Sequence, residues 1–204
     1  AAACVSRLLR RNHTIAVGMG RNVASVADAM SERPGADTIV VSAIGGSPLI
    51  GSRINSNDIC RRFAARLGGT GIELYAPAFA ETPSVRDSFL SHDDVKATLT
   101  RARRADIAVV GIGDAESDSA VVRIGCVPPQ DMERLRNAKA VGDILGNFFN
   151  KDGKMVDQGV HDRVIGLSEH DLRAIPCVVG IASEAGKAVA VRAGAHTRCV
   201  VTAP

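Results

Sequence analysis

The strongest constraint on the fold is a regular alternation of short apolar runs with helical patterns. Residues 14–17 form one such run, Gly18 and Gly20 follow it, and residues 23–30 then repeat apolar side chains at helical spacing. A second apolar run, at 38–44, again leads through glycines to a helical pattern. Strands that alternate with helices form a parallel sheet, because each crossover needs a connecting helix. The sequence therefore predicts an α/β fold with a Rossmann-like parallel sheet and helices on both faces.

Similar patterns continue along the chain. They predict further strands at 72–75, 106–113, 177–182 and 199–202, a hairpin-like turn at 151–154, and helices at 1–11, 57–67, 84–90, 93–103, 129–139 and 187–193, with a helical turn at 171–174. Residues 114–124 are polar and irregular, and their pattern assigns no element. Because 204 residues with 46% apolar side chains suit one α/β domain, we expect residues 1–204 to form a single domain.

Several classes of protein are disfavoured by what the sequence lacks. No run approaches about 20 uninterrupted apolar residues, and no secretory signal is recognisable, so we expect no membrane span and a cytoplasmic location. The formal charge of +3 is too small to mark the whole chain as a nucleic-acid binder. The five cysteines form no CxxC pair and the five histidines no HExxH motif, so neither a disulfide framework nor a metal site is expected.

The predicted strand ends are unusually rich in glycine. Gly18 and Gly20, Gly45 and Gly46, and Gly111 and Gly113 each follow a predicted strand. Ligands gather at the carboxyl ends of parallel strands, where glycine lets the backbone come close and a helix N-terminus attracts anions. The pattern favours a cradle for a phosphate or a polyol, although α/β turns use glycine for purely structural reasons as well.

The first of these loops is not a nucleotide-binding motif. Val23 stands where a dinucleotide fingerprint has its third glycine, and there is no GK[ST] sequence. Arg21 could contribute a charged fork to a phosphate, and Asn22 could contribute an amide or could simply cap the helix. Lys187, at the start of a later helix, could reach a phosphate or remain a surface lysine. No GxSxG elbow or His/Asp order indicates a catalytic site, so none is predicted, and no cofactor is expected.

Ordered segments along the whole chain carry a family resemblance. The chain resembles the effector-binding domain of the SorC family of bacterial sugar-responsive transcriptional regulators. The matching segments are IAVGMG at 15–20, NDICRRFA at 57–64, YAPAF at 75–79, ADIAVVGIG at 105–113, AVGDI at 140–144 with the Phe148-Phe149 pair, RVIG at 163–166 and GK at 186–187.

The resemblance implies a fold like that of sugar-phosphate isomerases and deaminases, a phosphosugar or polyol effector, and a helix-turn-helix domain upstream that these residues lack. It implies a phosphate loop formed by Gly18, Gly20, Arg21 and Asn22. The residues implied to line the sugar are Gly45, Gly46, Asn57, Gly111, Gly113 and Asp143. Lys187 is implied to lie at the anion end of the site. The family more often has Thr or Ser where Arg21 or Asn22 stands. That departure leaves an unphosphorylated polyol open as the effector.

Two functions from different classes follow. The first is the ligand-sensing domain of a transcription regulator, which binds its effector without turnover and contacts DNA only through the helix-turn-helix domain. The second is a sugar-phosphate isomerase or deaminase, which needs a general base and an acid in one pocket, and the missing His/carboxylate constellation disfavours it. A regulator of this kind is expected to form a homodimer or homotetramer, with the arginine-rich helix near Arg61 and the segment around Phe148 and Phe149 as candidate contact surfaces.

Overall fold

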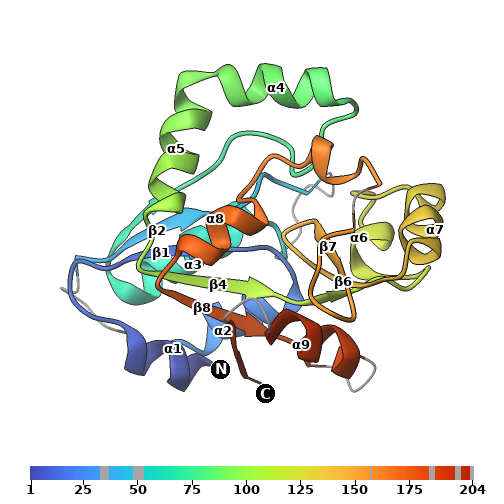
Figure 1. Ribbon diagram of the computed structural model, residues 1–204. Helices are drawn as coiled ribbons and strands as arrows, with labels where there is room; N and C mark the ends of the chain where they lie inside the picture. Colours follow the sequence, from blue (N-terminus) through green and yellow to red (C-terminus); the bar gives the residue numbers. More distant parts are fainter. Residues whose placement is uncertain (33–36, 48–52, 157, 184–186, 196–198, 203–204) are drawn as a thin grey trace.

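A six-stranded parallel sheet organises the molecule (Figure 1). The computed structural model describes residues 1–32, 37–47, 53–156, 158–183, 187–195 and 199–202. The strands lie in the order β3-β2-β1-β4-β8-β9 and every neighbouring pair is parallel. Their bounds are β1 Thr14–Val17, β2 Ile39–Ser42, β3 Thr70–Ile72, β4 Ile107–Gly111, β8 Cys177–Ile181 and β9 Cys199–Thr202. The predicted Rossmann-like α/β fold is confirmed.

The direction in which successive strands are added to this sheet reverses at its centre, between β1 and β4. Ile15 of β1 pairs with Val40 of β2 on one side and with Ile107 of β4 on the other. From β1 the chain builds outward to β2 and β3, then crosses to β4 and builds outward to β8 and β9. Loops that leave β1 and β4 therefore diverge, which opens a crevice at the carboxyl ends of these two strands.

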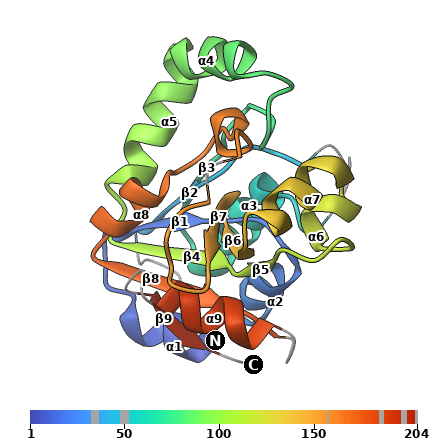
Figure 2. The same ribbon diagram turned by 45° about the vertical axis from the view of Figure 1, so that its right-hand side comes forward.

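Helices cover both faces of the sheet because the side chains of each strand alternate between faces. Ile15 and Val17 pack with α1 (Ala2–Leu8), α2 (Arg21–Ala29) and α3 (Ser56–Leu67). Ala16, between them in the sequence, packs into the cluster on the opposite face. The opposite face is covered by α5 (Asp93–Arg103), α8 (Glu169–Ala174) and α9 (Ala188–Ala195), while α7 (Pro129–Asn137) packs against β6 (Ala140–Ile144) of a smaller sheet. Helix α4 (Pro83–Ser91) precedes α5 and buries none of its residues. Figure 2 shows α5 above the sheet and α1 below it.

The ends of two helices follow from local chemistry. The side chain of Asn55 caps α3 by accepting from the backbone N–H of Asn57 at 3.0 Å, and Gly68 ends that helix in the left-handed conformation. The Ser168 hydroxyl and the Asp171 carboxylate form a capping box at the start of α8. These caps fix where the helices begin and end, and hence where the loops at the sheet edges start.

A small antiparallel sheet lies beside the carboxyl ends of the main sheet. It consists of β5 (Gly113–Asp114), β6 (Ala140–Ile144) and β7 (Asn147–Asn150). Leu145 and Gly146, both at positive φ, form the tight turn between β6 and β7. The short helix α6 (Ala120–Arg123) and the 3-10 turn η1 (His161–Arg163) complete this part of the molecule.

Some predicted boundaries differ from the structure. The run at 106–113 divides into β4 and β5, because Ile112 donates its N–H to Ile181 of the main sheet whereas Gly113 pairs with Asp143 of the small sheet. The first helix ends at Leu8 rather than at residue 11, and the strand expected at 72–75 lies at Thr70–Ile72. Phe148 and Phe149, expected as a contact surface, are 1% and 3% exposed and belong to the core.

Candidate functional site

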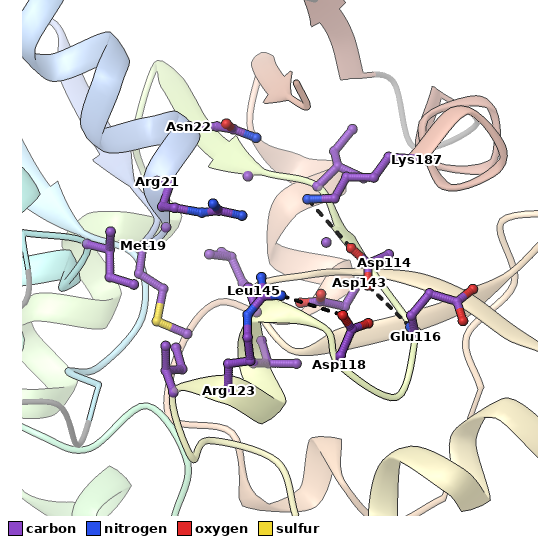
Figure 3. Close-up of a pocket in the computed structure, with 18 residues that line it drawn as sticks. Met19, Arg21, Asn22, Asp114, Glu116, Asp118, Arg123, Asp143, Leu145 and Lys187 are labelled. Atoms are coloured by element: carbon purple, nitrogen blue, oxygen red, sulfur yellow. Dashed lines mark hydrogen bonds and ion pairs between the residues drawn. The ribbon is translucent and has the colours of Figure 1, made fainter. Parts of the chain in front are cut away.

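A pocket of about 600 Å³ opens where β1 and β4 diverge (Figure 3). Its walls come from the loop after β1 with the start of α2, the segment after β4 through α6, the β6–β7 hairpin and the start of α9. This volume lies within the range of small-molecule sites. The pocket therefore occupies the position at which ligands bind in doubly wound α/β sheets.

The N-terminus of α2 faces this pocket. Gly20 is the N-cap residue, with φ 113°, and no side chain caps the helix or places an acidic group in its first turn. Arg21 and Asn22 follow, and both line the pocket. Figure 3 shows both side chains extending from the helix toward the pocket centre. An N-terminus of this kind carries partial positive charge and N–H groups suited to an anion.

Asn22 is held in place from the neighbouring strand end. Its Oδ1 accepts a hydrogen bond from the Ser183 hydroxyl at 2.7 Å, so the amide links the start of α2 to the loop after β8. Because Gly20 occupies the N-cap position, the interpretation of Asn22 as the cap of this helix is wrong.

Opposite α2, three charged side chains meet at the buried end of the pocket. Lys187 is 7% exposed, and its Nζ lies 3.6 Å from Oδ2 of Asp114. Asp143 is 5% exposed, and its Oδ2 accepts the backbone N–H of Gly146 at 2.9 Å. Burial raises the pKa of Asp143 to about 6, and Asp114 raises it as well, whereas the Gly146 N–H and Lys187 act in the opposite direction. A carboxyl in this setting can donate to or accept from a ligand hydroxyl, depending on pH.

The segment that the sequence pattern left unassigned supplies much of the pocket wall. Asp114, Glu116 and Asp118 all line it, and Arg123 joins them from α6. The Asp114 side chain accepts the Glu116 backbone N–H at 3.2 Å, and Arg123 lies 3.7 Å from Asp118. The sequence pattern did not identify these residues as site candidates. The available signal was the three acidic residues at alternate positions directly after a buried strand.

Seven of the eleven predicted site residues line the pocket. They are Gly20, Arg21, Asn22, Gly111, Gly113, Asp143 and Lys187. They come from four separate parts of the chain. Those after β1, β4 and β8 are brought together because they follow strand ends of the main sheet, whereas Asp143 reaches the pocket through the pairing of β6 with β5. Gly18 lies immediately beside the pocket but does not line its described part. Its N–H donates to Val109 at 2.9 Å, and a Cβ there would lie 2.9 Å from the Leu145 side chain, so Gly18 permits close packing.

Gly45, Gly46 and Asn57 are not among the described residues that line the pocket, and their contacts are structural. A Cβ on Gly45 would lie 2.3 Å from the Pro77 carbonyl oxygen. Gly46 donates its N–H to the Ala76 carbonyl at 2.8 Å. Gly45 is therefore needed where this loop runs close against the segment after β3, and the Gly46 hydrogen bond joins the same two segments.

The side-chain amide of Asn57 also joins the end of β2 to the segment after β3. Its Oδ1 accepts from the Ser42 hydroxyl at 2.8 Å and from the Leu74 N–H at 3.0 Å, and its Nδ2 donates to the Leu74 carbonyl at 3.1 Å. Asn57 thus satisfies both backbone groups of a buried residue, which leaves this amide engaged within the protein.

Neither a membrane-spanning helix nor a metal-binding cluster is present among the described residues. Within the ranges that the structure covers, no helix has the length and hydropathy of a membrane span. No group of three or more His, Cys, Asp or Glu side chains in that part of the chain is arranged to hold a metal ion.

The doubly wound sheet and a pocket with cations, carboxylates and a helix N-terminus define a domain that binds a small polar ligand. Comparison with known proteins agrees with this class. The family model described as "Putative sugar-binding domain" matches residues 1–202, so this chain belongs to the family of sugar-binding domains of SorC- and DeoR-type transcriptional regulators. The resemblance stated from the sequence is thereby confirmed.

Individual relatives support this assignment. A sugar-binding domain of a transcriptional repressor from Vibrio fischeri is 41% identical, with a TM-score of 0.86 over 99% of this chain and 81% of that one. The full-length sorbitol operon regulator SorC from Klebsiella pneumoniae is 26% identical, with a TM-score of 0.91 over 99% of this chain and 67% of that one.

A curated relative shows how the lengths compare. The erythritol catabolism regulatory protein EryD from Brucella abortus is 27% identical over 182 residues, which are 89% of this chain but 57% of that protein. The chain thus spans little more than half the length of this relative.

Proposed function

We propose that this domain senses a sugar or polyol, most favourably in phosphorylated form, for a transcription regulator of carbohydrate catabolism. The observation that carries the proposal is the convergence of the α2 N-terminus, Lys187 and buried Asp143 on one pocket at the centre of the sheet. The names of two relatives, a regulator of erythritol catabolism and a sorbitol operon regulator, support an effector with several hydroxyl groups.

The two ends of the pocket suit the two ends of such an effector. A phosphate would accept from the first-turn N–H groups of α2, with the guanidinium of Arg21 and the ammonium of Lys187 adding charge. Hydroxyl groups would donate to the carboxylates of Asp114 and Asp143, which lie across the pocket. An unphosphorylated polyol would use only the second set of contacts and would bind with little dependence on salt.

The proposed output is a change in DNA binding. A helix-turn-helix domain outside these residues would read the operator, and the effector would act by binding one arrangement of the regulator more tightly than another. We propose a homodimer or homotetramer in the cytoplasm, because paired half-sites in DNA require paired DNA-binding domains.

Binding without turnover is part of the proposal. The relatives named above are transcriptional regulators, and no histidine is among the described residues that line the pocket. Incubation of the chain with sugar phosphates, followed by analysis for ketose, aldose or released ammonia, should show no product. Product formation that depends on Asp143 would instead favour an isomerase or deaminase.

Calorimetric titration with matched ligand pairs tests the sensing role. Candidate phosphosugars and polyol phosphates, first selected by thermal shift, are titrated beside their unphosphorylated forms, for example erythritol phosphate beside erythritol. Stoichiometric binding that favours the phosphorylated member and weakens with salt would support the proposal. Equal affinity for both members would assign an uncharged effector, and no binding to any of them would overturn the sensing role.

A further inference from the structure

Arginines gather at the amino-terminal ends of the central strands β1 and β4, at the opposite end of these strands from the pocket. Arg10 and Arg11 lie in the turn before β1, and Arg101, Arg103 and Arg104 lie at the end of α5 before β4. We call these five side chains the amino-edge arginines. Both views place the α1–β1 connection and the end of α5 at the left side, away from the small sheet that borders the pocket (Figures 1 and 2).

Backbone contacts hold these two segments side by side. Thr14 donates its N–H to the Asp106 carboxylate at 2.8 Å, and Asp106 donates its own N–H to the Thr14 carbonyl at 2.9 Å. Thr14 follows the turn that contains Arg10, and Asp106 is two residues beyond Arg104. The arginines of both segments therefore belong to one surface.

This surface carries more positive charge than its carboxylates neutralise. Arg11 pairs with Asp37 at 3.1 Å, and Arg103 pairs with Asp171 at 3.2 Å. The exposed side chains of Arg10, Arg101 and Arg104 have no carboxylate within ion-pair distance in the described part of the chain. Because the Asp106 carboxylate also lies at this surface, five arginines face three carboxylates, which leaves two cationic charges at one end of a chain whose whole formal charge is +3.

Helix electrostatics explains only part of this arrangement. Arg101 and Arg103 lie in the last turn of α5, where positive charge stabilises the helix C-terminus. Arg104 is the C-cap and Arg10 belongs to a different segment, so neither lies within that last turn. Arg101 and Arg104 are also three residues apart on one helical face, where like charges repel each other. A polyanion bound to this face would relieve that repulsion.

We propose that the amino-edge arginines bind the phosphate backbone of duplex DNA without reading its sequence. The charge complements that of DNA, and arginine offers a planar fork for phosphate oxygens. The surface lies at the sheet edge away from the pocket, so DNA and effector can occupy the domain together. This inference rests on the proposed function, because it needs a domain that works beside DNA, and it adds a sequence-independent contact to the reading done by the helix-turn-helix domain.

Fluorescence anisotropy with a labelled duplex of arbitrary sequence tests this inference on the 204-residue chain. Affinity is measured at several salt concentrations for the unsubstituted chain, for Arg101→Gln/Arg104→Gln, and for Lys151→Gln/Lys154→Gln. Lys151 and Lys154 are exposed in the turn after β7, so the second variant removes the same charge from a different surface. Circular dichroism melting checks that each variant is folded.

The expected result is weak binding by the unsubstituted chain that falls steeply with salt. Each phosphate contact contributes about −0.9 to the slope of log affinity against log salt concentration. The arginine variant lacks two such contacts, so its slope should be shallower by about 1.8. The lysine variant should keep the slope of the unsubstituted chain. Effector titrations of all three proteins should agree, which separates a failure at this surface from a failure at the pocket.

Three outcomes would overturn the proposal. Equal loss in both variants would show a general effect of net charge, and no binding at low salt would show that the surface does not hold DNA. A change in sedimentation of the arginine variant, with DNA affinity unaltered, would mean that the surface contacts an acidic region of a second copy instead.

Discussion

Gly113 and Asp143 are paired across β5 and β6, and a Cβ on Gly113 would lie 2.0 Å from Oδ1 of Asp143. The carboxylate cannot easily move aside, because its Oδ2 is fixed by the Gly146 N–H and the side chain is buried. The glycine therefore provides the space in which the pocket's buried carboxyl lies.

Gly113→Ala should lower the free energy of unfolding by about 1–3 kcal/mol, because the added methyl group overpacks a buried site. It should also weaken effector binding, because Asp143 must shift. For stability, Gly111→Ala is the matched control, since a Cβ there would meet its nearest atom, the Met19 carbonyl oxygen, at 3.5 Å. Denaturant unfolding and calorimetry of both variants provide the test, and equal stability losses would contradict the role given to Gly113.

The buried carboxyl of Asp143 should make stability depend on pH. Its pKa is raised from 3.8 to about 6 in the folded chain, so the stability that it contributes is present below pH 3.8 and is lost as pH rises through about 6. Asp143→Asn keeps an acceptor for the Gly146 N–H but cannot ionise. It should reduce the change in unfolding free energy between pH 4 and 7 by about 1–3 kcal/mol. An unchanged pH profile in this variant would assign the dependence to other groups.

Lys187→Ala should weaken a phosphorylated effector about ten- to a hundredfold, because one charge-assisted contact is lost. The affinity of an uncharged polyol should change less, and its salt dependence should stay small. Lys96→Ala, an exposed lysine on α5, serves as the control and should leave binding unaltered. Calorimetric titration at two salt concentrations distinguishes the cases, and full affinity for a phosphorylated effector in the Lys187 variant would place the phosphate elsewhere.

Asn57→Ala should reduce stability and leave effector affinity unchanged in the folded protein. The substitution removes three hydrogen bonds and leaves the N–H of fully buried Leu74 without the amide acceptor, at a cost of about 2–4 kcal/mol. Asn137→Ala, exposed at the end of α7, should cost far less. The test combines chemical denaturation with effector titration. A loss of effector affinity without a loss of stability would show that Asn57 contacts the effector.

Local pattern was sufficient for the scaffold and for part of the site. The apolar run and glycines around Gly18 and Gly20 indicated a strand end followed by a helix, because strand burial and helix initiation depend on neighbouring residues. The position of Lys187 at a later strand end was predictable for the same reason. Parallel strands bring such ends to one edge of the sheet, so these residues could be associated without knowing any contact.

Tertiary structure alone decided which of the strand-end glycines face the pocket. Gly45 and Gly46 share the local pattern of Gly111 and Gly113, but the segment after β3 packs against them, and a contact of that kind leaves no periodic signal in the sequence. Asp143 likewise reaches the pocket through the register of an antiparallel hairpin, which pairs it with a residue 30 positions earlier in the chain. The sequence by itself determined the succession of strands, helices and glycine turns along the chain, because these depend on local spacing. The placement of the carboxylates and the hydrogen bonds of Asn57 to Ser42 and Leu74 depended on long-range packing, because only the folded chain brings those groups within contact distance.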